Sequence, residues 1–188
     1  MWTDKLTGRA SASVNLGKWG KRIPCDGIIL GIDPSLRGTG LAVIEFRPQQ
    51  PAYLLFSRTV SIKHGIAMVT CLGEIAQAVT EILARWTISA AAIEQTIYVQ
   101  NFQTAQVLGA ARGAAIAPVS MQGIPVFEYA PLRIKQAIVG FGRASKEQVG
   151  SMVKSQLNLT GNLPPDESDA AAVALCYALN LREAADVK

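Results

Sequence analysis

Short apolar runs and longer amphipathic stretches alternate along the chain. Three apolar runs come first, separated by short turns with proline or glycine, and they predict strands at about residues 27–33, 40–47 and 52–60. Residues 65–86 then place apolar side chains at spacings of three and four, which predicts an amphipathic helix. The short turns favour an antiparallel order for the first three strands, whereas a strand that follows a helix is expected to join the sheet in parallel.

The second half of the chain alternates single strands with helices. Buried strands are predicted at 88–94 and 124–129, and helices at 102–121, 131–139, about 145–157 and from Asp166 onward. Ser145 with Gln148 three residues later fits a capping box at the start of one of these helices. We therefore expect an α/β fold with a mixed sheet, three antiparallel strands followed by parallel ones, flanked by helices.

A stripe of small residues runs along the predicted helix 102–121. Its members recur every four residues and are Ala105, Gly109, Gly113 and Ala117. Small side chains let a helix approach its neighbour closely. The neighbour is either the sheet or a second subunit, and the sequence does not distinguish the two.

Composition excludes several classes of protein. The chain has 188 residues, of which 49% are hydrophobic and 17% are charged, so disorder is excluded and one domain with a proper core is expected. No run of about 18 apolar residues exists to span a membrane. The three cysteines are far apart, and with one histidine the sequence favours neither a zinc site nor serine–histidine–aspartate chemistry.

Charge is distributed unevenly. Residues 1–24 carry five basic residues against one acidic residue, and residues 131–154 do the same, whereas residues 166–188 carry five acidic against two basic residues. We interpret residues 1–24 as a flexible basic arm ahead of a domain at 25–188, able to contact nucleic acid through phosphates. An organelle presequence is the alternative interpretation of the arm, and Asp4 disfavours it.

Two predicted strands end on acids. Asp33 follows the apolar run at 28–32, and Glu94 follows the run at 88–93. An isolated buried charge would cost several kcal/mol, so a metal ion is an obvious neutralising partner. The alternative for Asp33, which precedes a proline, is that it only caps a turn. Neighbouring strands are about 5 Å apart, so both acids can reach one metal cluster.

A second pair of acids, Asp166 and Asp169, lies three residues apart at a predicted helix start. Acids there also stabilise the positive end of the helix dipole, so capping alone is the alternative interpretation. Together with Asp33 and Glu94 they form an all-carboxylate set, which suits Mg²⁺ or Mn²⁺. Two such ions can activate water and stabilise the leaving oxygen of a phosphodiester.

Six short motifs, in order from about residue 27 to 182, resemble those of the RuvC family of Holliday-junction resolvases. Each motif alone is weak evidence, but six at compatible spacing are strong evidence. They are Gly31-Ile32-Asp33-Pro34 with Thr39-Gly40, Ala92-Ile93-Glu94-Gln95, Leu108-Gly109 with Arg112-Gly113, Pro125-Val126-Phe127-Glu128-Tyr129, Lys135-Gln136 with Val139-Gly140, and Asp166 with Asp169-Ala170.

The resemblance implies a ribonuclease-H-like fold and a homodimer that cuts four-way DNA junctions by paired symmetric nicks. Asp33, Glu94, Asp166 and Asp169 match the family's four catalytic acids, which hold two Mg²⁺ ions per subunit, with Mn²⁺ as a substitute. The products would carry a 5′-phosphate and a 3′-hydroxyl. The resemblance also implies a branch-migration helicase as a partner and a cytoplasmic, nucleoid-associated location.

The resemblance also implies DNA-binding residues. Lys135 and Lys146 match basic positions near the cleaved backbone, and Arg143 lies in the same basic stretch. The family often places an aromatic residue three positions after its second acid. Here Ile97 occupies that position and Tyr98 follows it, so Tyr98 either stacks on a base or lies on a loop surface.

Three other functions compete with junction resolution. A related nuclease with relaxed selectivity would cut flaps, three-way junctions or replication forks with the same four acids. An actin-like phosphate-binding ATPase also has an Asp and a Gly-Thr-Gly turn in its first hairpin, but needs two such domains. A junction-binding protein without chemistry would have been favoured by the loss of any of the four acids, and all four are present.

Overall fold

Three antiparallel strands form one half of the sheet. The computed structural model describes residues 23–95 and 101–181. Strand β1 (Gly27–Asp33) pairs antiparallel with β2 (Gly38–Phe46), which pairs antiparallel with β3 (Tyr53–Ser61). In this register Asp33 lies opposite Gly40, so the acid is at the turn end of the first hairpin.

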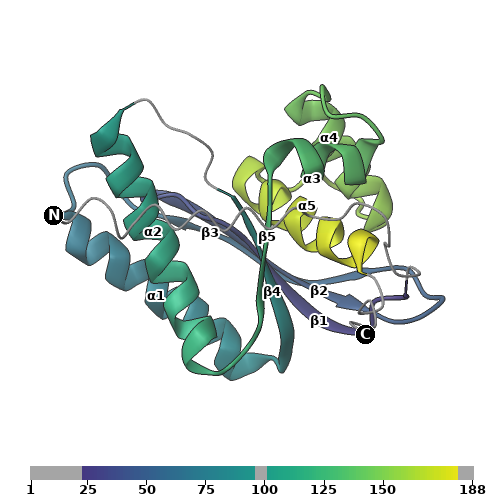
Figure 1. Cartoon of the computed structure of the whole chain (residues 1–188), viewed down its shortest axis with the longest axis horizontal. Coiled ribbons are helices and arrows are strands. Elements are labelled where there is room, and N and C mark those ends of the chain that lie inside the picture. Colours follow the sequence, from purple (N-terminus) through teal and green to yellow (C-terminus); the bar gives the residue numbers. More distant parts are fainter. Residues whose placement is uncertain (1–22, 96–100, 182–188) are drawn as a thin grey trace, which may run out of the picture. The chain divides into compact units, whose positions relative to one another are not determined.

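Two parallel strands complete the sheet. Helix α1 (Met68–Arg85) leads to β4 (Ile88–Glu94), which pairs parallel with β1, and α2 (Phe102–Met121) leads to β5 (Val126–Tyr129), which pairs parallel with β4. The strand order is β3-β2-β1-β4-β5 (Figure 1). This confirms the predicted mixed sheet and its ribonuclease-H-like topology.

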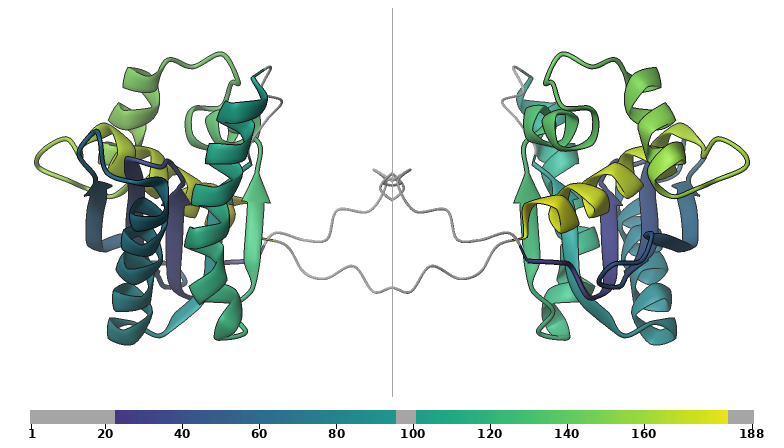
Figure 2. Two further views of the ribbon diagram at one scale, coloured as in Figure 1. Left: turned by 90° about the vertical axis from the view of Figure 1, so that its left-hand side faces the viewer. Right: turned by 90° about the vertical axis from the view of Figure 1, so that its right-hand side faces the viewer.

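Helices cover both faces of the sheet. Helices α1 and α2 lie on one face, whereas α3 (Pro131–Val139), α4 (Lys146–Gln156) and α5 (Pro165–Asn180) lie on the other (Figure 1). The two views of Figure 2 show these helical layers from opposite sides. The side chains of Ser145 and Gln148 form the predicted capping box of α4.

The alternation of side chains along each strand produces two apolar cores. Ile29 and Ala42 enter the core beneath α3, α4 and α5, whereas Leu30 and Leu41 enter the core beneath α1 and α2. Because successive residues of a strand point to opposite faces, Asp33 shares the face of Ile29 and Glu94 that of Ala92. Both acids therefore face the α5 side of the sheet.

The prediction of a buried strand at 124–129 is wrong in one respect. β5 is a strand, but Phe127 and Glu128 are exposed on it. In the sheet formed by the described residues, β5 is the last strand, so one of its sides has no strand beside it. Its apolar run resembled that of a central strand because periodicity alone does not distinguish the two.

The small-residue stripe of α2 does not pack on the sheet. Gly109, Gly113 and Ala117 are exposed, and Ala105 is half-buried. The helix instead buries Ala111, Ala115 and Val119 against the sheet and α1. The structure thus decides against the first of the two interpretations of the stripe.

The described helices and strands belong to one compact unit, Pro24–Leu181. Within residues 23–95 and 101–181, no helix is both long and apolar enough to cross a membrane. Residues 1–22 lie outside the described residues, so the basic arm at 1–24 and the domain boundary at 25 stay predictions.

Candidate active site

The first hairpin positions Asp33 through a buried hydroxyl. The Thr39 hydroxyl donates a hydrogen bond to the Ser35 carbonyl oxygen at 2.5 Å and accepts one from the Ser35 amide at 3.2 Å. These two bonds close the turn that follows Asp33 and satisfy a side chain that has no access to solvent. The turn therefore fixes the end of β1, where the Asp33 carboxylate begins.

Helix α5 approaches this end of the sheet over glycines. A Cβ atom on Gly31 would lie 2.0 Å from the Ala170 carbonyl oxygen, and one on Gly40 would lie 1.9 Å from the Asp166 carbonyl oxygen. No real Cβ makes contacts this short, so only glycine permits the approach. The same contact brings the Asp166 carboxylate above Gly38, where a Cβ would lie 3.1 Å from Asp166 Oδ2.

The four predicted acids meet where β1 and β4 end beneath the start of α5. Burial, followed by the nearby charges of Glu94, Asp169 and Asp166, raises the pKa of Asp33 to about 7, and Lys146 opposes this rise. Burial, followed by the charge of Asp169, raises the pKa of Glu94 as well. All four side chains are half-buried, so water screens their mutual repulsion only partly.

Two of the predicted DNA-binding residues, both lysines, lie at this cluster. Lys146 Nζ donates a hydrogen bond to Asp169 Oδ2 at 2.8 Å, and this bond with the charge of Asp169 raises the Lys146 pKa. The charges of Lys146 and Lys135 both lower the pKa of Glu94. The Lys146 side chain remains 76% exposed, so it can reach a phosphate in solvent as well as the acid beneath it.

The structure does not bring the other two predicted DNA-binding residues, Arg143 and Tyr98, to the acids. Arg143 is exposed in the loop between α3 and α4, and in the described part of the chain it forms no ion pair. Tyr98 lies outside the described residues, so its stacking role stays a prediction.

The donor chemistry of the cluster fits a hard divalent cation. All four candidate ligands are carboxylates, and Mg²⁺ and Mn²⁺ prefer oxygen ligands of this kind. Burial and the repulsion from neighbouring acids, which together raise the pKa of Asp33, both favour a cation between the acids. Within residues 23–95 and 101–181, no three acidic, histidine or cysteine side chains are arranged to hold one ion together, and Lys146 forms an ion pair with Asp169.

Glu167 is a site residue that the sequence did not reveal. The Ser57 hydroxyl donates a hydrogen bond to Glu167 Oε2 at 2.5 Å, and the Thr59 hydroxyl donates to Glu167 Oε1 at 3.4 Å. These bonds tie the first turn of α5 to β3, between the two acids of the helix. The available signal was a pair of hydroxyl residues at alternate positions of β3, on the face that otherwise packs against α5.

A model of the family described as crossover junction endodeoxyribonuclease RuvC matches residues 29–177. Curated relatives carry the same description. The protein of Methylobacillus flagellatus is 43% identical over 155 residues, which is 80% of this chain and 86% of the relative. That of Cupriavidus metallidurans is 42% identical over 150 residues, or 80% and 82% of the two chains.

Solved structures share the fold. Thermus thermophilus RuvC in complex with a Holliday junction substrate superimposes with a TM-score of 0.77 and 32% identity, covering 81% of this chain and 93% of the other. The yeast mitochondrial Holliday junction resolvase superimposes with a TM-score of 0.57 at 11% identity, covering 85% and 82% of the two chains, and shows likeness of fold alone.

Proposed function

The chain belongs to the RuvC family of crossover junction endodeoxyribonucleases, and on that premise we propose that it resolves four-way DNA junctions by Mg²⁺-dependent hydrolysis. One observation supports this proposal most directly. The carboxylates of four acids meet where β1 and β4 end, with Lys146 beside them, and these acids are Asp33, Glu94, Asp166 and Asp169. The family assignment decides against the actin-like ATPase interpretation.

Each part of the site has a role in this proposal. The four carboxylates would hold two Mg²⁺ ions, or Mn²⁺ in their place, and such ions activate water and stabilise the leaving oxygen of a phosphodiester. Lys146 and Lys135 would bind the phosphate backbone next to the acids and so orient the scissile bond. Arg143 and Tyr98 would contact DNA further from the acids. Cleavage would leave a 5′-phosphate and a 3′-hydroxyl.

We propose further that the enzyme is a homodimer joined along the exposed stripe of α2. The apolar residues of α2 lie all around the helix, and Phe102 and Met121 are exposed at its two ends. The exposed positions of α2 carry no charged side chain, and glycines at its centre suit close approach of a second helix. Two copies would place two sites on a junction, as paired symmetric nicks require. A branch-migration helicase is the proposed partner on chromosomal DNA in the cytoplasm.

The test is cleavage of a synthetic four-way junction with and without Mg²⁺, beside an Asp33→Asn variant. We expect paired nicks that need the cation, disappear in the variant and can be sealed by DNA ligase, which requires a 5′-phosphate next to a 3′-hydroxyl. Cleavage of flap, three-way and fork substrates is measured in parallel. Equal cleavage of all of them would replace the proposal by a relaxed branched-DNA nuclease, and binding without cleavage would indicate a non-catalytic protein.

A further inference from the structure

Arg112 contacts the strand that carries Glu94 from the opposite face of the sheet. It lies on α2, and its side chain is only 18% exposed. Its Nη1 donates a hydrogen bond to the Glu94 carbonyl oxygen at 3.3 Å, and its Nη2 forms an ion pair with Glu128 Oε1 on β5. One guanidinium therefore joins the end of β4 to the neighbouring edge strand.

The Glu94 carbonyl lacks the backbone donor that a longer β1 would supply. The amides of Ala91 and Gln95 donate to the carbonyls of Pro125, which precedes β5, and of Tyr129 in β5. The backbone groups of Glu94 therefore point the other way, towards β1. Ile32 pairs with Ile93, so continuing this register would pair Asp33 with Glu94. In a parallel ladder the Glu94 carbonyl would then accept from the amide of the residue after Asp33, which is residue 34. Residue 34 is proline, which has no amide hydrogen.

The arrangement also balances the charge of a mostly buried arginine. A guanidinium removed from water requires a counter-ion and acceptors for its several N–H groups. Glu128 supplies the charge and the Glu94 carbonyl supplies a further acceptor. On the other face, Asp33 and Asp169 repel the Glu94 carboxylate. Lys146 and Lys135 offset part of this repulsion, and Arg112 contacts the end of β4 from the α2 side.

We propose that Arg112, supported by Glu128, is a positioning residue that fixes the end of β4 and thereby the Glu94 carboxylate for cation binding and turnover. The inference rests on the proposed function, in which Glu94 is a metal ligand. Partners of this kind, which touch a ligand residue but not the cation, change metal affinity or activity by about 10- to 100-fold when they are removed.

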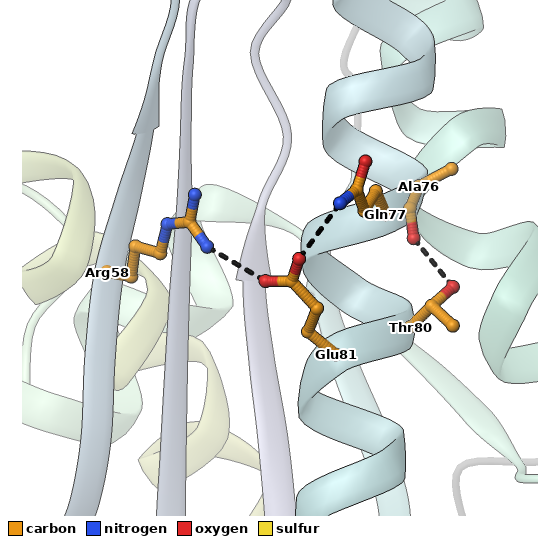
Figure 3. A network of polar contacts seen from close by, with 5 residues as sticks. All are labelled: Arg58, Ala76, Gln77, Thr80 and Glu81. Atoms are coloured by element: carbon orange, nitrogen blue, oxygen red, sulfur yellow. Dashed lines mark hydrogen bonds and ion pairs between the residues drawn. The ribbon is translucent and has the colours of Figure 1, made fainter.

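The test compares three variants at Arg112 and Glu128 with a control variant in another arginine–glutamate ion pair. Arg112→Lys keeps a positive charge for Glu128, but an ammonium does not span two acceptors as the guanidinium fork does. Arg112→Met removes both contacts, and Glu128→Gln removes the counter-ion. The matched control is Arg58→Lys, since Arg58 Nη1 contacts Glu81 Oε2 at 3.2 Å and this pair bridges β3 and α1 (Figure 3).

We expect Arg112→Lys to lower kcat on the junction and to weaken Mn²⁺ binding, measured by titration calorimetry, each by about 10-fold. The Kd for the junction without divalent cation should stay within about twofold of wild type, and Arg58→Lys should change neither quantity. Wild-type kcat and Mn²⁺ affinity in Arg112→Lys and Glu128→Gln would overturn the proposal, even if Arg112→Met fails to fold. Wild-type protein that cleaves no junction would instead overturn the proposed function.

Discussion

A Cβ atom on Gly40 would lie 1.9 Å from the carbonyl oxygen of Asp166. Gly40 is also the residue opposite Asp33 in the first hairpin, so this contact sets how closely two candidate catalytic acids approach. The obstacle to a side chain is backbone rather than a flexible side-chain end, and α5 would have to move to accommodate it.

Gly40→Ala is therefore expected to destabilise the protein by about 1–3 kcal/mol, as overpacking of a filled core does, and to reduce cleavage further because Asp166 is displaced. Urea unfolding and junction cleavage are the measurements. The matched control is Gly73→Ala on α1, where a Cβ meets nothing within 4 Å. Alanine there should stabilise the helix by up to about 1 kcal/mol. Equal effects of the two substitutions would contradict the packing argument.

The raised pKa of Asp33 predicts a pH dependence of stability. Burial and neighbouring acids raise the pKa to about 7 in the folded protein, against about 3.9 in an unfolded chain. Between these values the folded state binds more protons, so the free energy of unfolding falls as the pH rises from about 4 to 7. The slope should be measured by urea unfolding in EDTA.

Asp33→Asn should flatten this slope, because the amide does not titrate, and should be at least as stable as wild type at pH 7. The loss in wild type is a few kcal/mol at most, at about 1.4 kcal/mol per tenfold change in proton affinity. Parallel curves for the two proteins would show that Asp33 does not carry the effect.

Lys146→Ala should slow junction cleavage or weaken junction binding while leaving the fold intact. The Lys146–Asp169 pair is mostly exposed on the lysine side, and such pairs contribute about 0–1 kcal/mol to stability. Lys135→Ala should act similarly, since its charge also reaches Glu94. Lys63→Ala, an exposed lysine that is not among the charges affecting these acids, serves as the control. Unchanged binding and turnover in both Lys135 and Lys146 variants would refute their role.

Glu167→Ala should destabilise α5 at its first turn. The substitution removes the acceptor of the Ser57 and Thr59 hydroxyls, and hydrogen bonds to charged groups contribute about 1.5–3 kcal/mol. Thermal unfolding of Glu167→Ala, of Ser57→Ala and of the double variant gives the coupling between them. Additive effects of the two substitutions would show that the short bond contributes little.

Gly113→Glu should prevent dimer formation without unfolding the subunit. Space outside Gly113 is open, so the side chain fits the monomer, but it places a charge in the proposed contact between two α2 helices. Light scattering after size-exclusion chromatography measures the mass directly. Gly73→Glu on α1 is the control and should leave the oligomeric state unchanged. A Gly113→Glu protein with the mass of wild type would place the interface elsewhere.

The pattern of apolar residues was enough to predict the helices and strands, their order and the mixed sheet, because this pattern has a different period in a helix and in a strand. It also placed Asp33 and Glu94 at strand ends and the Asp166–Asp169 pair at a helix start. It was wrong about the burial of β5 and left open what the small-residue stripe of α2 packs against, because burial depends on which neighbours a segment acquires in space.

How these residues act on one another became apparent from the packing of the folded chain. The raised pKa of Asp33, the Lys146–Asp169 bond and the Glu167 contacts all depend on α5 lying against Gly31 and Gly40. Arg112 on α2 donates to the Glu94 carbonyl oxygen across 18 residues of chain. Such contacts join residues far apart in the chain, and their strength depends on distances and burial that local sequence patterns do not contain.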